Sequence, residues 1–169
     1  MEQDAVPAPK QSQTIYGTQE LVLTGQDLQQ LGMAGPGCRT EEGYTNIVDP
    51  SQGQYSFCNY TIARLNDTEV LIELQKFDNI EALNGTYQYQ SLHYFSVEGL
   101  LSEDDFGDQS RFRVSNEHDY GGQFNDPDVS YYHLWITKDL FLIHITTQGS
   151  NGTREHVAAI GRRILSKFG

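Results

Sequence analysis

The sequence predicts a single α+β domain, in which a mostly antiparallel sheet of about five to seven strands is flanked by helices as an α/β/α sandwich. Three observations support this class. Several short segments alternate apolar and polar side chains, two longer segments repeat apolar residues at helical spacing, and the connections between them are short. The 169 residues contain no internal repeat and no boundary to a second domain. A composition of 37% hydrophobic and 20% charged residues suits one globular core.

The first residues are expected to lie outside that domain. Residues 1–15 are polar and contain Pro7 and Pro9, so we expect a disordered linker that remains after removal of a signal or lipid-anchor segment. A native disordered terminus is the alternative. Residues 16–169 then form the single α+β domain.

The N-terminal part of the domain is predicted to begin with a strand at Glu20–Leu23 and a short helix opened by Thr24. Asp27 lies three residues after Thr24 and completes a capping-box pattern. The stretch from residue 35 to 53 is rich in Gly, Pro and polar residues, which indicates a loop with one short strand near residues 44–48.

Two strands and a helix follow. The segments "QYSFCNYTIARL" and "TEVLIELQKF" read as strands joined by a hairpin turn at Asn66-Asp67. The next segment has helical spacing and begins at Asp78, with Glu81 three residues later, so Asp78 is the expected N-cap. Gly85 lies inside this predicted helix, where it costs about 1 kcal/mol relative to alanine.

The C-terminal part is predicted to contain an acidic loop, a strand with Phe112 and Val114, a second loop over residues 117–128, and two strands within residues 131–149. A last amphipathic helix is capped by Thr153. Its apolar stripe is formed by Val157, Ile160, Ile164 and Phe168.

Charge and missing motifs narrow the function. The net charge of −12 leaves no basic surface to neutralise phosphates, so we expect no nucleic-acid partner. No apolar run approaches the roughly 20 residues of a membrane-spanning helix. The chain has no Gly-X-Ser-X-Gly, phosphate-loop or His-Glu-X-X-His motif, and we predict neither a cofactor nor enzymatic activity. Glu73 with a loop aspartate would be an acid–base pair of the kind that any acidic protein supplies.

Two features favour an extracellular or cell-surface location. The only cysteines, Cys38 and Cys58, are predicted to form a disulfide that stabilises the fold by about 3 kcal/mol, with two buried free thiols as the alternative. Four of the eight asparagines also carry the glycosylation sequon. Asn66 and Asn151 are the candidate acceptors, because the other two are expected in a strand and a helix. Those two are Asn59 and Asn84.

The order of several segments resembles a known family. "VLIELQKFDNIEALNGTY" is followed by "FGDQSRF", by "HLWITKDLFLIHI" and by the last helix. This pattern resembles the PsbP-like α/β/α sandwich, and it is more similar to archaeal and bacterial surface lipoproteins and to the extracellular sensor domains of mycobacterial kinases. In such domains a Gly-Asp pair, here Gly107-Asp108, precedes the closing hairpin. The resemblance covers Leu21 to Phe168 and implies the fold, but it implies no catalytic residue.

Two histidines, His133 and His144, are the strongest candidate site. With Lys138 and Asp139 as the hairpin turn, His133 lies directly opposite His144, on the same face as Trp135. Directly opposed residues have Cβ atoms roughly 4.5–5.5 Å apart, which allows two imidazoles to chelate one metal or to share a hydrogen bond. The same register pairs apolar residues on the other face, namely Ile136 with Phe141, Leu134 with Ile143, and Tyr132 with Ile145.

Metal binding by this histidine pair is the weaker of its two interpretations. A tight site needs a third ligand, for which Tyr131, His93, His118 and the acidic loop residues are candidates. A hydrogen-bonded polar patch under a helix explains the pair without a metal. The segments "NDPDVS" and "SEDDFGD" offer oxygens for calcium but lack EF-hand spacing, so solvated acidic loops explain them better.

The sequence therefore predicts a non-catalytic binding or accessory domain of a surface-anchored or secreted protein. Its partner would be a protein or a small-molecule ligand, and a lipid anchor would lie upstream. Tyrosines and phenylalanines that line a cleft would suit such a ligand, although they suit a small core equally well. A metal-binding protein that uses His133 and His144 is the alternative, and an uncharacterised enzyme is the third hypothesis.

Overall fold

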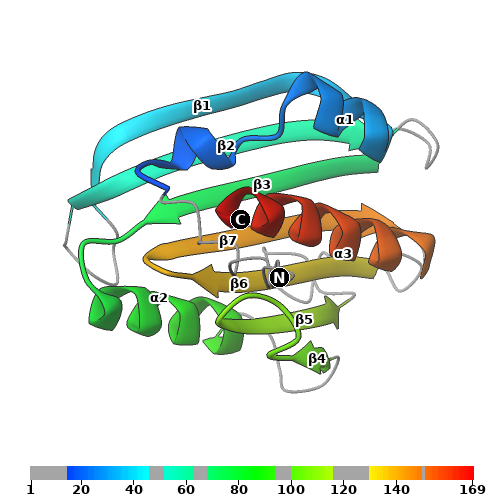
Figure 1. The fold of residues 1–169 in the computed structure, drawn as a ribbon. Coiled ribbons are helices and arrows are strands. Elements are labelled where there is room, and N and C mark those ends of the chain that lie inside the picture. Colours follow the sequence, from blue (N-terminus) through cyan, green and yellow to red (C-terminus); the bar gives the residue numbers. More distant parts are fainter. Residues whose placement is uncertain (1–14, 46–51, 63–67, 94–99, 116–129, 150) are drawn as a thin grey trace, which may run out of the picture.

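The protein is an α+β fold built on one antiparallel sheet (Figure 1). The computed structural model describes residues 15–45, 52–62, 68–93, 100–115, 130–149 and 151–169. In these residues, seven strands follow the order β1-β2-β3-β7-β6-β5-β4, and every neighbouring pair is antiparallel. The strands are β1 (Met33–Thr45), β2 (Gln52–Ile62), β3 (Thr68–Lys76), β4 (Leu100–Glu103), β5 (Gln109–Ser115), β6 (Ser130–Lys138) and β7 (Phe141–Gly149).

The helices described in the structure lie on opposite faces of this sheet. They are α1 (Gly25–Leu31), α2 (Ile80–His93) and α3 (Asn151–Leu165), with short 3-10 turns η1 (Thr18–Leu21) and η4 (Ser166–Phe168). Helix α3 packs on β6 and β7 through Val157, Ile160 and Ile164, which join the main core. Helix α2 packs on the other face, because its apolar residues contact strand positions that alternate with those of the main core. None of these helices is long and apolar enough to span a membrane.

The two cores differ in size. The main core lies under α3 and holds the strand residues Val70, Ile72, Leu74, Leu134, Ile136, Ile143 and Ile145. The smaller cluster lies under α2 and consists of Phe77, Ala82, Leu83, Tyr87, Trp135 and Leu142. We call the α2 side of the sheet the back face. Since the small cluster covers only one end of the back face, the rest is available for polar side chains.

The N-terminal part of the fold differs from the sequence prediction in two places. Residues 18–21 form the 3-10 turn η1 rather than a strand at Glu20–Leu23, and residues 33–45 form β1 rather than a loop. This strand was not predicted because it contains Gly35, Pro36 and Gly37, residues that usually indicate a loop. They are tolerated because β1 is an edge strand, and its register with β2 shifts between Ala34 and Gly37.

Some helix caps also differ from the prediction. The Thr24 capping box is confirmed, since Thr24 Oγ1 accepts a hydrogen bond from the Asp27 amide at 3.1 Å. Helix α2 is capped by Asn79 rather than Asp78, because Asn79 Oδ1 accepts a hydrogen bond from the Ala82 amide at 2.8 Å. Helix α3 begins two residues before Thr153, which is buried in its first turn. The acidic loop contains the short strand β4, which was not predicted.

The register of the hairpin between β6 and β7 differs from the prediction by two residues. Lys138 pairs with Phe141, so Asp139 and Leu140 form the turn. Asp139 adopts the left-handed region, with φ 52°, which Asp tolerates better than most residues. Asp108 fixes this turn, because its Oδ2 accepts a hydrogen bond from the Asp139 amide at 2.8 Å and its Oδ1 lies 3.6 Å from Lys138 Nζ. Moving the turn by one residue changes every partner but leaves each side chain on its predicted face.

A disulfide joins the two edge-most N-terminal strands. Cys38 on β1 lies directly opposite Cys58 on β2, and their sulfur atoms are bonded. Among the sequon asparagines, Asn59 lies in β2, and Asn84 in α2 accepts a hydrogen bond from Gln109 at 2.9 Å. Asn151 is the first residue of α3. Asn66, the predicted Asn66-Asp67 turn, residues 1–14 and the predicted loop over 117–128 lie outside the described residues.

Replacing Gly107 with alanine is expected to destabilise the fold by about 2 kcal/mol. Gly107 has φ 55°, and an added Cβ would lie 2.5 Å from the Thr137 carbonyl oxygen, so neither backbone is able to relax cheaply. Gly85→Ala is the matched control. It lies in α2 with no atom within 4 Å of the added Cβ, so it should stabilise by about 1 kcal/mol. Urea unfolding followed by circular dichroism measures both changes, and equal effects would contradict this account.

Candidate functional site

A chain of hydrogen-bonded polar side chains crosses the back face. It runs through Tyr55 on β2, Glu73 on β3, His144 on β7 and His133 on β6, so four neighbouring strands contribute one residue each. The Tyr55 hydroxyl donates to Glu73 Oε2 at 2.9 Å, and Glu73 Oε1 lies 3.1 Å from His144 Nδ1. His144 Nε2 lies 3.1 Å from His133 Nδ1. We call these four residues the polar chain.

The two histidines lie within hydrogen-bonding distance, as predicted, but the strand register that brings them together differs from the predicted one. His133 lies opposite Thr146, and His144 lies opposite Trp135, so the histidines are diagonal neighbours rather than a directly opposed pair. Their ring planes differ by 20° and their centroids are 5.4 Å apart. With the facing nitrogens 3.1 Å apart, this is the separation of two imidazoles that meet edge to edge in nearly one plane. The facing nitrogens therefore point at each other and share one proton.

Trp135 covers the histidine pair on one side. Its ring is 4.5 Å from that of His144 with an interplanar angle of 8°, and 5.2 Å from that of His133 with an angle of 12°. Trp135 is 1% exposed and also belongs to the apolar cluster under α2. It therefore separates the polar chain from that cluster, and its electron-rich face favours a positive charge on the stacked imidazoles.

The charges within the polar chain are set by burial and by neighbouring groups. Burial opposes ionisation of Glu73, but the hydrogen bonds from His144 and Tyr55 and the charge on His144 outweigh it, so the pKa of Glu73 is lowered. An ionised carboxylate only accepts, so His144 Nδ1 is the donor to Glu73. Burial places the pKa of His133 well below its usual value, and positive charge on His144 and Arg113 lowers it further. His133 is therefore neutral at physiological pH.

His133 should make the fold less stable in mild acid. Its pKa is lowered on folding, so the unfolded chain binds a proton that the native protein does not, and stability falls as the pH drops below about 6.5. His133→Asn should reduce the slope by up to about 1.4 kcal/mol per pH unit between pH 6.5 and 5. Asn retains an amide donor near the Nδ1 position. Urea unfolding at several pH values measures the slope.

Thr146→Val is the control for that measurement. Thr146 Oγ1 lies 3.1 Å from His144 Nε2, so this variant removes a hydrogen bond of the same network without removing a titrating group. It should lower stability equally at all these pH values. Parallel pH profiles for the wild type and His133→Asn would show that His133 is not the acid-sensitive group.

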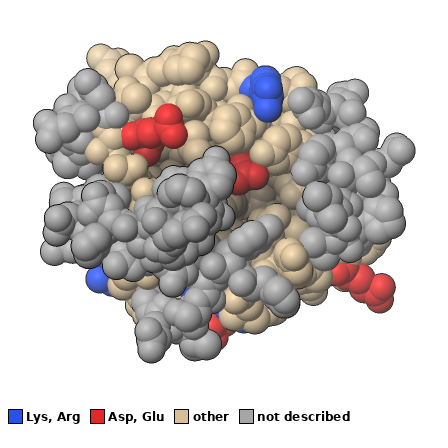
Figure 2. Space-filling model, turned by 180° about the vertical axis from the view of Figure 1, so that it is seen from behind, with Lys and Arg blue, Asp and Glu red and all other residues tan. Residues whose placement is uncertain are grey.

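A pocket on the back face is lined in part by His133. Its volume is about 140 Å³, and its lining mixes polar and apolar groups. Its wall combines one apolar residue with hydroxyl, imidazole, amide and carboxylate groups, which are those of Glu69, Leu71, Tyr131, His133, Thr146, Thr147 and Gln148. Figure 2 shows this side of the molecule, where most of the surface that is not drawn in grey carries neither acidic nor basic residues. The pocket has the size and polarity to hold a small polar ligand.

Two arginines on β5 extend the site. Arg113 lies opposite His133, and Arg111 lies opposite Trp135, so both belong to the back face. Arg111 is paired with Glu103 at 3.3 Å and donates to the Ser91 hydroxyl at 2.7 Å. Arg113 is 1% exposed and donates from Nη1 to the Ser91 carbonyl at 3.2 Å. Burial, and then the charge of Arg111, lower the pKa of Arg113.

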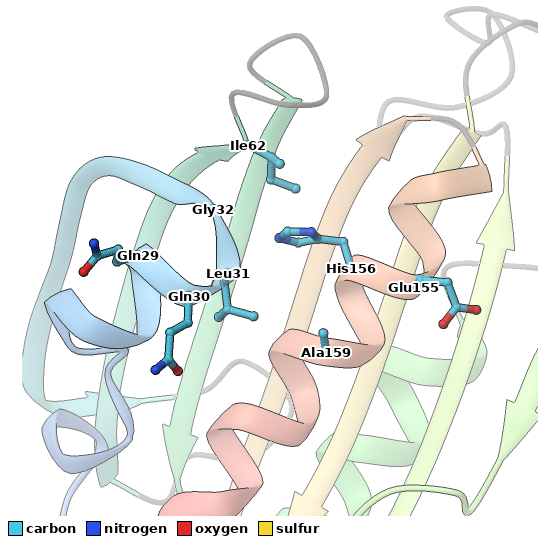
Figure 3. A pocket seen from close by; sticks show the side chains of 8 residues that line it. All are labelled: Gln29, Gln30, Leu31, Gly32, Ile62, Glu155, His156 and Ala159. Carbon is cyan, nitrogen blue, oxygen red and sulfur yellow. The ribbon is translucent and has the colours of Figure 1, made fainter.

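A larger cavity of about 360 Å³ lies on the other face, between the end of α1 and the start of α3 (Figure 3). His156 points from α3 across the gap toward Ile62, whereas Glu155 and Gln29 point away from it. Its polar side chains do not converge, so it is a poorer candidate than the smaller pocket on the back face. A ligand site depends on a few polar groups aimed at one point.

The predicted site residues are distributed unevenly. Tyr131 lines the pocket beside His133. His93 ends α2 and its side chain lies outside the described part of the structure, as does all of His118. Within the described residues, no group of three or more His, Cys, Asp and Glu is arranged to hold a metal ion. The sequence reasoning missed Arg113, whose one signal is its position between Phe112 and Val114, where strand alternation puts it on the other face.

The comparisons define the class of fold. The crystal structure of the extracellular domain of PknH from Mycobacterium tuberculosis superimposes with a TM-score of 0.51 at 8% sequence identity, over 92% of this chain and 99% of that one. No protein-family model matches the sequence, and no curated protein does either. The likeness to PknH thus concerns the fold.

Proposed function

We propose that this protein is a non-catalytic, extracytoplasmic domain that binds a small polar ligand in the back-face pocket. The observation that carries the proposal is the 140 Å³ pocket whose wall places His133 of the polar chain and the Thr146 hydroxyl beside the apolar side chain of Leu71. The likeness to an extracellular kinase domain and the disulfide between Cys38 and Cys58 support an exported location.

The proposal includes the finer features that the sequence predicts. The helices on both faces of the sheet support an α/β/α sandwich of the PsbP-like type. Residues 1–15 would be a linker to a lipid anchor or membrane, and Asn66 and Asn151 would be the glycan acceptors. Expression through a eukaryotic secretory pathway, followed by intact mass before and after glycosidase, tests the acceptors. A mass without glycan would reject them.

A ligand screen by thermal unfolding tests the pocket. Trp135 is the only tryptophan and stacks on His133, which lines the pocket, so its fluorescence should respond to a ligand that contacts His133. Leu71→Phe fills the pocket without removing a member of the polar chain. Leu100→Phe is the matched control, because Leu100 lies 39% exposed on the edge strand β4. We expect ligands that raise the melting temperature and change Trp135 emission in the wild type and the control only.

Two outcomes would reject the pocket as the binding site. One is a ligand that binds equally well to Leu71→Phe. The other is the absence of any stabilising ligand from a library that covers small anions, cations and neutral polar compounds.

A metal held by both histidines is the second candidate, and the histidine geometry disfavours it. Two ligands of one ion must aim their lone pairs at a common third point, whereas His133 Nδ1 and His144 Nε2 aim at each other at 3.1 Å. Native mass spectrometry with added zinc or copper tests it. We expect no stoichiometric adduct, and an adduct abolished by His144→Ala would restore the metal site.

A further inference from the structure

The back-face pocket is lined by two rows of side chains that cross β3, β7 and β6. The first row consists of Leu71, its β7 partner Thr146, and His133, which is the β6 partner of Thr146. Thr146 Oγ1 lies 3.1 Å from His144 Nε2 and 3.4 Å from His133 Nδ1, so its hydroxyl belongs to the hydrogen bonds around the polar chain. His133 is neutral at physiological pH. The first row therefore gives the pocket one apolar side chain and uncharged polar groups.

The second row contains a carboxylate. Tyr131 on β6 is the register partner of Gln148 on β7. Glu69 lies two residues before Leu71 on β3, so strand alternation places both on the same face. The Thr147 hydroxyl on β7 donates to the Glu69 backbone carbonyl at 2.8 Å, which holds the beginning of β3 beside this row. Among the described residues that line the pocket, Glu69 is the one that carries a charge.

The negative charge of Glu69 is not balanced by a neighbour. In the part of the chain that the structure describes, no Lys, Arg or His forms an ion pair with it. Its register partner on β2 is the uncharged Thr61. The next acidic residue on this face of β3, Glu73, is already hydrogen-bonded to His144. Arg113 does not line the pocket and lies on β5, three strand spacings or roughly 14 Å from β3.

This lining suits a small ammonium compound. The Glu69 carboxylate is an acceptor for charged N–H donors, and the aromatic ring of Tyr131 attracts cations. Leu71 offers an apolar contact for a short alkyl chain. A volume of 140 Å³ holds about four or five non-hydrogen atoms, at roughly 30 Å³ for each. The net charge of −12 attracts cations to the protein and opposes the entry of anions.

We propose that the ligand of this domain is a small primary ammonium compound, whose N–H groups donate to the Glu69 carboxylate while its short alkyl chain lies beside Leu71. This inference rests on the proposed function and adds the chemical class of the ligand. It also gives the uncompensated carboxylate at the pocket an opposite charge.

Thermal unfolding with three compounds of similar size tests the ammonium group. The probes are propylammonium chloride, 1-propanol and sodium propionate at about pH 7.5, where the amine is protonated and the acid is ionised. Sodium chloride keeps the ionic strength equal in all samples. At about ten times the dissociation constant, propylammonium should raise the melting temperature of the wild type by about 3–6 °C, whereas propanol and propionate should not. No shift up to about 100 mM propylammonium, which saturates a site of millimolar affinity, would overturn the inference.

Two variants that remove one negative charge each assign the effect to Glu69. Glu69→Gln should weaken propylammonium binding about 10-fold, the value of one charge-assisted hydrogen bond that is partly exposed to water. Glu69 is exposed, so without ligand this variant should melt close to the temperature of the wild type. Glu81→Gln is the matched control, because Glu81 is exposed in the first turn of α2 and does not line the pocket. It should bind propylammonium as the wild type does, although its net charge equals that of Glu69→Gln.

The outcomes separate this inference from the proposed function. Propanol or propionate that binds at least as well as propylammonium, with sensitivity to Leu71→Phe, would overturn the ammonium group and leave the pocket intact. Propylammonium binding that needs Glu69 but is unaffected by Leu71→Phe would overturn the place of the pocket in both proposals. Equal affinities of the wild type and Glu69→Gln for propylammonium, or equal losses in Glu69→Gln and Glu81→Gln, would overturn the inference.

Discussion

Replacing Trp135 with alanine is expected to lower the free energy of unfolding by about 3–5 kcal/mol. The indole is 1% exposed and contacts both the apolar cluster under α2 and the rings of the histidine pair. Its removal leaves a cavity in the small core and exposes the hydrogen-bonded imidazoles. Because the variant has no tryptophan, urea unfolding must be followed by circular dichroism.

Trp135→Phe is the matched control for that prediction. It keeps an aromatic face against His144 and removes only part of the volume, so it should cost clearly less than alanine. A loss below about 1 kcal/mol for Trp135→Ala would mean that Trp135 is not part of a packed core. Equal losses of stability for the two variants would show that a phenyl ring at this position recovers none of the stability that the indole provides.

Replacing both cysteines with serine is expected to cost about 3 kcal/mol, the second-largest effect. The bond joins β1 to β2 across a sequence separation of 20 residues, and without it the unfolded chain gains freedom that it must lose again on folding. The free energy of unfolding in an oxidising buffer measures this loss for Cys38→Ser/Cys58→Ser against the wild type.

Reductant supplies the control for the cysteine variant. Dithiothreitol should lower the melting temperature of the wild type toward that of the double variant and leave the variant unchanged. A wild type that is indifferent to reductant and whose mass shows two free thiols would contradict the disulfide and remove one argument for export.

Much of the fold was predictable because its signals are local. The alternation of Val70, Ile72 and Leu74 marks β3, and the apolar stripe of the last helix marks α3. β1 was not predictable, because Gly35 and Pro36 indicate a loop in any local window. Only the pairing of β1 with β2 at the sheet edge makes a strand of this segment.

The candidate site was predictable only in part, for the same reason. A register shift of two residues leaves His133 and His144 on the same face of the sheet. The two residues are therefore close together even though the predicted register was wrong by two residues. Glu73 lies beside His144 because β3 pairs with β7, and Arg113 lies beside His133 because β5 pairs with β6. Both neighbours depend on the order of strands in the sheet. No sequence pattern within either strand specifies that order.

The strand order also has a kinetic consequence. Each of the two meanders, β1-β2-β3 and β7-β6-β5-β4, pairs strands that are neighbours in the sequence, and they join only where β3 pairs with β7. That seam brings residues near position 72 against residues near position 145, so it has the highest contact order in the sheet and should form last during folding. Glu73 and His144 face each other across it. The polar chain should therefore assemble only in the final folding step, and half-folded chains should lack the pocket to which we assign ligand binding.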